Sequence, residues 1–233
     1  SNYKKMFINA KYYGWKLSSY KNQLDKFVVS KNNELKRLEE IYTLNAKKSG
    51  VNLLKGKASF IDNNTIKVNN RKITGKNIII AVGGHPRKLE IPGFQYCLDS
   101  DSIMQLKKIP KSLTIIGAGY IAIEFAFIFS LLGSKINLIC RNTILKDFDI
   151  DLVKLLVESL EKNGVDIFYK EQVEKISLKG KLKRIKLKRS RKNLLSEEIL
   201  VAVGRNPNIK DLDLDKANIK CNENLSIKVN AKL

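Results

Sequence analysis

Two glycines and an alanine form the most specific chemical signal in this chain. Gly117, Gly119 and Ala122 follow the spacing G-x-G-x-x-A. Gly117 permits a tight turn, and Gly119 has no side chain, so a pyrophosphate group can approach the backbone there. Ala122 is small enough for close contact between a helix and a strand. A helix that begins at this turn would direct unpaired N–H groups and the positive end of its dipole at the anion.

The sequence around these residues predicts the elements that position them. Residues 113–116 are a short apolar run typical of a buried parallel strand, and residues 120–132 continue at helical spacing. Gly133 ends the helix, and residues 135–140 supply a second strand. A lone G-x-G-x-x-A spacing also occurs in ordinary glycine turns. The strand before it, with the helix and the strand after it, favours a dinucleotide-binding unit.

A basic residue occupies the position that selects between nicotinamide cofactors. In folds that bind NAD, an Asp or Glu at the end of the second strand bonds the ribose hydroxyls of the adenosine. This chain has Arg141 there, and Lys146 follows in the same loop. Two cations suit a 2′-phosphate, which an arginine binds with paired donors. Ordinary surface cations are the alternative in so lysine-rich a chain, but the position of Arg141 favours NADPH.

Size and composition are those of a globular protein. With 233 residues, of which 43% are hydrophobic and 29% charged, the chain has room for one large or two modest domains. No apolar run approaches the roughly 20 residues that span a membrane, and the polar residues 1–5 are not a secretory signal. Cys97, Cys140 and Cys221 are widely spaced, which suggests neither a disulfide framework nor a zinc site. We therefore expect no metal, no membrane contact and a reducing, cytoplasmic setting.

The strong positive charge raises nucleic acid or an acidic surface as a partner. The formal net charge is +21, and much of the excess lies in residues 179–192. Ile185 and Leu187 alternate there with basic residues, as in a half-buried strand with a solvated face. No aromatic residue lies among them to stack on bases, as single-strand binders usually supply. Lys, Asn and Ile recur along the whole chain, so a general bias in amino-acid composition is the simpler explanation of the positive charge. Nucleic acid is therefore the less favoured partner.

The remaining pattern predicts an α/β fold with a domain boundary in the extended connection at residues 85–93. Before this boundary we expect a long amphipathic helix at residues 22–47 and short strands at residues 51–54, 57–61, 65–68, 71–74 and 77–82. After it we expect helices at residues 102–108 and 149–163, a third parallel strand at 165–169, an antiparallel meander at 173–177, 181–188 and 193–196, and a buried strand at 198–203.

Five motifs together resemble one family, the FAD-dependent pyridine nucleotide-disulfide reductases, and most closely its glutathione reductases. The motifs are G-A-G-Y-I-A-I-E at 117–124, A-V-G-G-H-P at 81–86, I-P-G at 91–93, S-D at 100–101 and A-V-G-R-N-P-N at 202–208. The resemblance implies a Rossmann-like NADPH-binding domain at residues 85–206, with a parallel sheet and an antiparallel meander. That domain would be inserted in a discontinuous FAD-binding domain, which residues 1–84 begin and to which residues 207–233 return.

The same resemblance implies a catalytic group around the flavin. Tyr120 would be the gate that moves aside for the nicotinamide, and Glu124 would pair with Lys4 beside the flavin. Tyr120 and Glu124 are four residues apart and so share a helical face. From the residues alone, Tyr120 could equally be a packing residue. A Glu124 carboxylate buried among apolar neighbours would be costly without a partner.

Further positions follow from the resemblance in the same way. Tyr42 would line the disulfide-substrate site, although a half-buried helix aromatic is nearly as good an explanation. From the residues alone, His85, the single histidine, follows Gly83 and Gly84 in a loop, and we expect it to be structural. The positions implied to contact NADPH or FAD, beyond the glycines and cations above, are Ala118, Ile121, Gly204 and Arg205 for NADPH, and Ala58 and Gly83 for FAD.

The chain also departs from the family pattern. The redox-active cysteine pair of the family would end just before Lys4, and Ser1 stands where its second cysteine would be. The electron transfer that follows flavin reduction needs a thiolate–disulfide pair. No FAD fingerprint precedes Ser1, and no dimer-interface segment with the family's histidine follows Leu233. We therefore expect part of a longer, homodimeric enzyme, inactive as this stretch alone.

The expected parent reaction passes a hydride from NADPH to FAD, and then electrons through the cysteine pair to oxidised glutathione. Enzymes of the same family that act on trypanothione, thioredoxin or dihydrolipoamide are alternatives. Arg141 argues against the dihydrolipoamide enzyme, because that enzyme uses NAD. An alternative from another class is a non-catalytic basic protein that keeps a nucleotide-binding fold and binds nucleic acid or an acidic partner.

Overall fold

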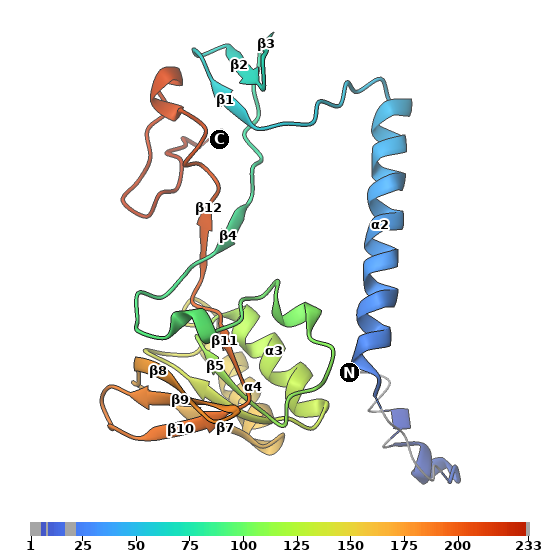
Figure 1. The fold of residues 1–233 in the computed structure, drawn as a ribbon, viewed down its shortest axis with the longest axis vertical. Coiled ribbons are helices and arrows are strands. Elements are labelled where there is room, and N and C mark those ends of the chain that lie inside the picture. Colours follow the sequence, from blue (N-terminus) through green and yellow to red (C-terminus); the bar gives the residue numbers. More distant parts are fainter. Residues whose placement is uncertain (1–5, 8, 17–21, 232–233) are drawn as a thin grey trace. The chain divides into compact units, whose positions relative to one another are not determined.

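The computed structural model describes residues 6–7, 9–16 and 22–231 (Figure 1). Its contacts divide the chain into two compact units. The larger unit comprises Ser1–Asn32 and Pro86–Gly204, and the smaller unit comprises Asn33–His85 and Arg205–Leu233. The larger unit therefore contains nearly all of the region predicted to bind the dinucleotide, including the glycine turn and Arg141.

A four-stranded parallel sheet in the order β11-β5-β6-β7 is the centre of the larger unit. Its strands are β5 (Ser112–Ile116), β6 (Lys135–Ile139), β7 (Val165–Phe168) and β11 (Glu198–Val201). Ile116 lies opposite both Ile139 and Val201, so β5, β6 and β11 end level with one another. The segments that follow these three strands therefore emerge side by side at the carboxyl edge of the sheet.

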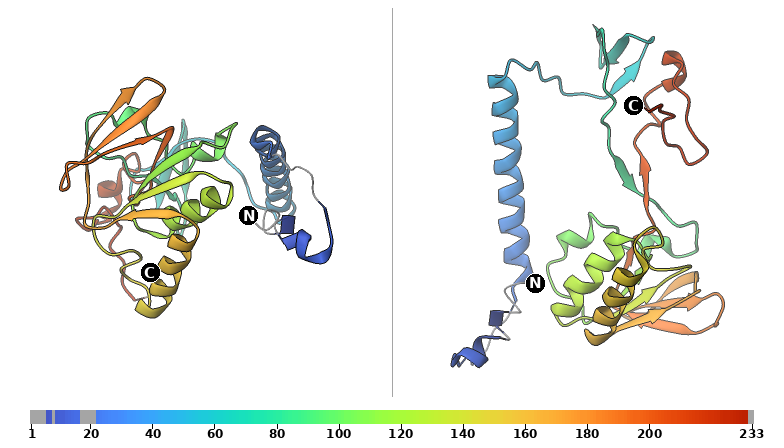
Figure 2. Two further views of the ribbon diagram at one scale, coloured as in Figure 1. Left: turned by 90° about the horizontal axis from the view of Figure 1, so that it is seen from below. Right: turned by 180° about the vertical axis from the view of Figure 1, so that it is seen from behind.

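Two helices cover one face of this sheet (Figure 2). They are α3 (Tyr120–Leu131), whose apolar run leaves five of its side chains buried, and α4 (Ile150–Lys162). Ala122 is completely buried against the sheet, as the close helix–strand contact requires. The carboxylate of Asp149 caps α4 by accepting the N–H groups of Asp151 at 3.0 Å and Leu152 at 3.1 Å.

A three-stranded antiparallel meander covers the other face. It consists of β8 (Val173–Lys179), β9 (Leu182–Leu187) and β10 (Asn193–Ser196). Ile185 and Leu187 are fully buried against Ile139 and the neighbouring strands, which confirms the predicted half-buried strand. The hydroxyl groups of Thr114 and Ser196 lie 2.6 Å apart in this interface. Alternating side chains of the parallel strands thus face helices on one side and the meander on the other.

The smaller unit contains a three-stranded antiparallel sheet and nearly all of a two-stranded sheet. The strands β1 (Ala58–Phe60), β2 (Thr65–Val68) and β3 (Arg71–Thr74) form one sheet, and β4 (Gly84–Pro86) pairs with β12 (Arg205–Pro207) in the other. Phe60 is buried with Leu212 and Leu214, and its N–H group donates to the Leu212 carbonyl at 2.8 Å. This contact joins two stretches that are about 150 residues apart in sequence.

Most of the predicted elements are confirmed, including the long helix, which is α2 (Leu24–Lys48). The α/β class with one parallel sheet and antiparallel sheets is confirmed as well. Insertion of this fold in a discontinuous FAD-binding domain stays a prediction. Among the described residues, no helix combines the length and the apolar character needed to cross a bilayer.

Three predicted elements are wrong. Residues 51–54 and 77–82 form no strand, because neither segment pairs with a second strand in the described chain. Ile79 is accordingly 89% exposed. Residues 102–108 form only the short turn η3 (Ile103–Gln105) instead of a helix. Ile103 is the one fully buried side chain of that stretch, so a longer helix would have little apolar face to pack.

Candidate functional site

The turn between β5 and α3 contains two glycines with different structural needs. Gly117 has a φ of 139°, and a Cβ atom there would lie 2.2 Å from the carbonyl oxygen of Ala202. The fold itself therefore requires glycine at this position. Gly119 has an ordinary φ of −85°, and a Cβ atom there would meet nothing within 4 Å. The fold does not require glycine at 119, so the open space fits a ligand that approaches the backbone.

The N-terminus of α3 opens onto this space. Gly119 is the N-cap residue of the helix, and in the described part of the chain no side chain caps it. The first turn of α3 also contains no acidic residue. Its free N–H groups and the positive end of its dipole therefore suit an anion such as a pyrophosphate.

The loop after β6 lies against the same turn. The N–H group of Leu145 donates to the Ala118 carbonyl at 2.9 Å, and Ile144 is only 1% exposed. Arg141 and Lys146, in the same loop, are exposed, and neither forms an ion pair with a described residue. The structure thus brings the two predicted cations to the edge of the sheet where the glycine turn lies.

A shallow hollow of about 400 Å³ adjoins this loop and continues along α4. Its lining is mostly apolar and consists of Thr143, Ile144, Leu145, Lys146, Phe148, Ile150, Val153, Lys154, Val157, Glu158 and Tyr169. The fingerprint glycines do not line this hollow, so it lies beside the candidate anion site.

Tyr120 and Glu124 lie on the solvent side of α3. Tyr120 is 58% exposed, and Glu124 is exposed while Ile123 and Phe125 next to it are buried. The helical period turns the carboxylate away from the sheet, so Glu124 does not meet the burial cost considered for it. Its predicted partner Lys4 lies outside the described residues, and the ion pair stays a prediction.

The motifs at 81–86 and 202–208 come together in the smaller unit. The Asn208 side chain donates to the Val82 carbonyl at 3.0 Å, and its Oδ1 lies 2.7 Å from Nδ1 of His85. The guanidinium of Arg205 donates to the Gly84 carbonyl. A Cβ atom at Gly84 would lie 2.7 Å from the Asn206 carbonyl oxygen, so the two strands can pair this closely only with glycine there. His85 is therefore part of this strand pairing.

The remaining predicted positions fall into both units. Ile121 packs at the edge of the helix–sheet core, and Gly204 has a φ of 112° while its carbonyl accepts the Arg87 N–H group at 2.9 Å. Three predicted positions belong to the smaller unit, and these are Ala58 in β1, Gly83 with a φ of 63°, and Tyr42, which is 69% exposed on α2.

Sequence reasoning missed one residue at the carboxyl edge of the sheet. Glu171 is only 5% exposed, and its carboxylate accepts the N–H groups of Arg189 at 2.8 Å, Ser190 at 2.9 Å and Gln172 at 3.1 Å. Burial by itself would raise its pKa, but these donors outweigh burial and lower the pKa of Glu171 to about 2. The sequence around Glu171, Y-K-E-Q-V-E-K, is ordinary charged surface sequence and gave no signal of this role.

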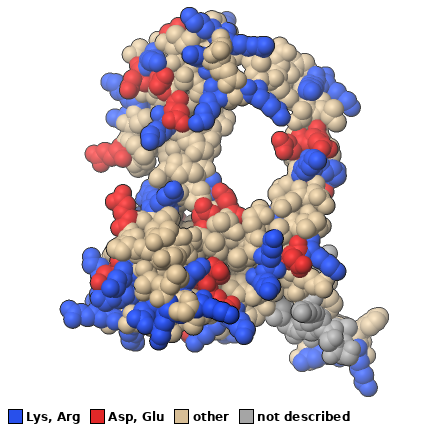
Figure 3. Space-filling view, viewed as in Figure 1, with Lys and Arg blue, Asp and Glu red and all other residues tan. Residues whose placement is uncertain are grey.

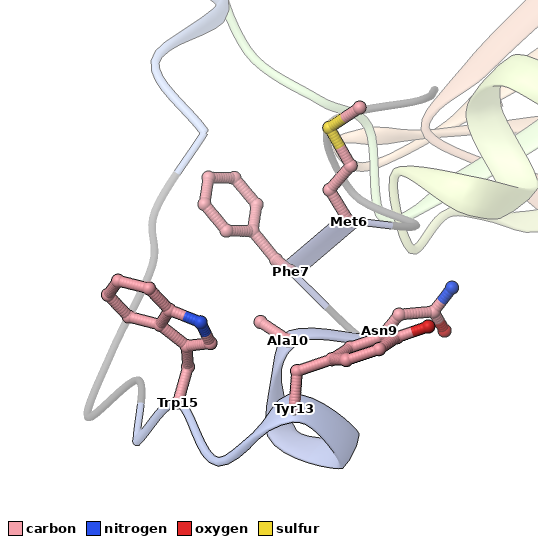
Figure 4. Close-up of a pocket in the computed structure, with 6 residues that line it drawn as sticks. All are labelled: Met6, Phe7, Asn9, Ala10, Tyr13 and Trp15. Atoms are coloured by element: carbon pink, nitrogen blue, oxygen red, sulfur yellow. The ribbon is translucent and has the colours of Figure 1, made fainter.

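Another hollow, of about 520 Å³, lies in the N-terminal segment (Figure 4). Figure 4 shows its side chains arranged around Ala10, and they are Met6, Phe7, Asn9, Tyr13 and Trp15. None of these side chains is a carboxylate, a cation or a thiol. In the described part of the chain, no three potential metal ligands converge either.

The family model described as "Pyridine nucleotide-disulphide oxidoreductase" matches residues 5–233. A glutathione reductase from Nostoc sp. is 37% identical over 229 residues, which are 94% of this chain and 48% of that protein. A mercuric reductase from Lysinibacillus sphaericus is 34% identical over 219 residues, with coverage of 92% and 39%. A dihydrolipoyl dehydrogenase from Mycoplasma genitalium is 33% identical over 190 residues, with coverage of 78% and 41%.

A solved structure is similar over nearly the whole chain. It is a Cu(II) complex of a variant of the HOCl-induced flavoprotein disulfide reductase RclA from Escherichia coli, with a TM-score of 0.82 and 26% identity. The match covers 99% of this chain and 52% of that one. The chain thus spans about half the length, or less, of the relatives that it matches.

Proposed function

The chain belongs to the pyridine nucleotide-disulphide oxidoreductases, and on that premise we propose that its larger unit binds NADPH for a flavoprotein disulfide reductase. Members of this family use FAD and a nicotinamide cofactor. One observation supports the proposal above the others. Open space at Gly119 faces the N-terminus of α3, and the Ala118–Leu145 hydrogen bond holds the loop of Arg141 and Lys146 beside it.

Each group of this site has a defined part in holding the cofactor. The backbone at Gly117–Gly119 and the first N–H groups of α3 would bind the pyrophosphate. Arg141 and Lys146 would neutralise the 2′-phosphate of the adenosine, where an acid would instead bond the ribose of NAD. Ala118, Ile121, Gly204 and Arg205 would complete the contacts to the dinucleotide. When bound, the nicotinamide and the flavin supply the redox chemistry, and the protein positions them.

The flavin side of the site is proposed from the family pattern. Tyr120 and Glu124 are exposed on the same side of α3 and free to meet a cofactor there. Tyr120 would shield the flavin until the nicotinamide arrives, and Glu124 would pair with Lys4. In the smaller unit, Ala58 and Gly83 would contact FAD.

Oxidised glutathione is the proposed disulfide substrate, with Tyr42 at its site. The glutathione reductase of Nostoc sp. is 37% identical to this chain. The full enzyme would be a cytoplasmic homodimer, and its cysteine pair would lie outside the present sequence. Because the chain is also similar to a mercuric reductase and a dihydrolipoyl dehydrogenase, other substrates are alternatives to glutathione. Arg141 argues against the dihydrolipoyl type, because that reaction uses NAD.

We expect the chain to bind NADPH more tightly than NADH and to lose this preference in Arg141→Glu. Replacing a cation that holds a phosphate with a carboxylate removes a charge-assisted contact and adds repulsion. The expected loss is at least about tenfold in the Kd for NADPH, or about 1.4 kcal/mol. Isothermal titration of both nucleotides into both proteins measures it. Equal affinity of the unmodified chain for NADPH and NADH would contradict the proposal.

Nucleic-acid binding is the alternative from another class, and the net charge of +21 favours it. A cation-driven complex with DNA weakens steeply as salt rises, because bound counterions are released. Tight binding of a DNA duplex with that salt dependence, together with no binding of NADPH, would favour this alternative.

A further inference from the structure

A strongly basic turn shares the carboxyl edge of the parallel sheet with the nucleotide site. Residues 188–192, K-R-S-R-K, connect β9 to β10. The Lys188 N–H group donates to the Gln172 carbonyl at 2.8 Å, just before β8 begins. The Glu171 N–H group donates to the Cys140 carbonyl at 3.0 Å, at the end of β6. Glu171 and Gln172 therefore bond the end of β6, next to Arg141, on one side and the basic turn on the other.

Glu171 holds this turn in place. Its buried carboxylate accepts the backbone N–H groups of Arg189 and Ser190, while its own N–H group bonds Cys140. Arg191 has a φ of 55°, a left-handed conformation that is unfavourable for an arginine. The anchored backbone starts both arginine side chains from the carboxyl edge of the sheet, where the Arg141 loop also begins.

The turn has more cations than it has acids beside it. All five residues are exposed, and none of the turn's four cations forms an ion pair with a described residue. Two acids lie near the turn. The carboxylate of Glu171 accepts N–H groups of its backbone, and Glu174 attracts Arg191 electrostatically but pairs with Lys186 at 2.9 Å. In Figure 3, Lys and Arg side chains crowd over the region where Figure 1 draws β8, β9 and β10. Cations gathered at one turn repel one another, and a phosphate group would relieve that repulsion.

The turn at the other end of the meander provides an internal comparison. Lys179 and Lys181 flank Gly180 between β8 and β9 and are exposed as well. The seven residues of β8 separate this turn from the carboxyl edge by about 20 Å. The comparison turn has two cations and the turn of residues 188–192 has four, but only the latter turn lies beside Arg141.

We propose that Arg189 and Arg191 help to select NADPH by binding the 2′-phosphate of its adenosine, together with Arg141. This inference rests on the proposed function and adds two specificity residues to the site. Arginine suits the role because its guanidinium engages phosphate oxygens with paired donors. The two arginines act in recognition and take no part in the transfer of the hydride.

The test compares adenosine 2′,5′-bisphosphate with adenosine 5′-monophosphate, which differ only in the 2′-phosphate. Calorimetric titration at low salt would use four proteins, namely the unmodified chain, Arg189→Gln/Arg191→Gln, Arg141→Gln and the control Lys179→Gln/Lys181→Gln. The double arginine variant is expected to bind the bisphosphate about tenfold more weakly and the monophosphate unchanged. The control removes the same charge and is expected to stay within about twofold for both ligands.

The outcomes separate the inference from the proposed function. If Arg141→Gln loses the preference for the bisphosphate and the double arginine variant keeps it, the inference is overturned and the proposed function stands. An equal loss in the lysine control would overturn the inference too, because general charge would then explain the effect. If the unmodified chain has no preference, both the proposed function and the inference are wrong. Equal melting temperatures of all four proteins would exclude misfolding as the cause.

Discussion

Gly117 and Gly119 have the same side chain for different physical reasons. Gly117 is confined by the Ala202 carbonyl and by its positive φ, so the folded chain itself selects glycine there. Gly119 has ordinary backbone geometry and no protein atom near the place of a side chain. A methyl group at position 119 would therefore collide with a bound ligand but with no atom of the protein. A substitution at this residue tests ligand binding directly.

We expect Gly119→Ala to fold normally and to bind NADPH at least about tenfold more weakly. The loss of glycine at the N-cap costs less than about 1 kcal/mol, and reduced freedom of the unfolded chain offsets part of that cost. Thermal unfolding followed by circular dichroism, with titration of NADPH, measures both effects.

Gly117→Ala is the matched control for this experiment. Its Cβ atom would collide with the Ala202 carbonyl, so we expect a loss of stability of roughly 1–3 kcal/mol. If Gly119→Ala binds NADPH as tightly as the unmodified chain, the pyrophosphate does not approach the backbone at 119.

At the scale of elements, the sheet edges are held by side chains that the hydrophobic pattern does not reveal. Glu171 ties the end of β6 to the β9–β10 turn, and the Thr114–Ser196 hydroxyl pair ties β5 to β10. The meander is therefore fixed to the parallel sheet by polar contacts as well as by Ile185 and Leu187.

We expect Glu171→Gln to destabilise the protein at neutral pH by about 2 kcal/mol, because the hydrogen bonds to a charged acceptor are weakened. The pKa of Glu171 in the folded chain is about 2, below its ordinary value of 4.5. The carboxylate therefore stabilises the fold fully above pH 4.5, and this contribution is lost as the pH falls toward 2.

Melting temperatures between pH 7 and pH 3 would test the expectation for Glu171. The difference between the unmodified chain and Glu171→Gln should shrink as the pH falls. Glu223→Gln, at an exposed carboxylate of the smaller unit, is the control. A difference in melting temperature that stays constant across the pH range would show that the ionised carboxylate of Glu171 does not stabilise the β9–β10 turn.

At the scale of the whole molecule, the three cysteines are spread over both units and none forms a disulfide. Burial raises the pKa of the Cys97 thiol to about 11, and burial raises the pKa of the Cys140 thiol to about 12. Neither thiol has the low pKa of a reactive cysteine. These residues are therefore unsuited to be the redox pair that the proposed reaction requires.

We expect Cys97 and Cys140 to react slowly with a thiol-specific disulfide reagent at pH 8. A pKa near 11 in place of 9.0 lowers the thiolate population of Cys97 by roughly a hundredfold. Peptide mapping of the labelled chain, before and after denaturation in guanidinium chloride, gives the rates. Labelling of folded Cys140 as fast as in the denatured chain would contradict its burial.

The regular elements that pack through their own apolar pattern could be predicted from the sequence. The strands around Leu113 and Ile136 and the helix of Ala122 were predictable because alternation and helical spacing are local properties. The glycine spacing and Arg141 predicted the candidate site in the same way. The strand predicted at residues 77–82 is wrong because an apolar run forms a strand only when a second strand pairs with it. Among the described residues no strand pairs with this run.

The sequence by itself determined the dinucleotide-binding unit, the family resemblance and the basic residue at the end of β6. Only the tertiary structure decided that Gly119 faces open space, that Glu124 is exposed, and that Glu171 holds the turn of Arg189 beside Arg141. The physical reason is the range of the interactions. Turn geometry and amphipathic spacing depend on neighbours in the chain, whereas a buried carboxylate finds its donors across the sheet, 18 residues away.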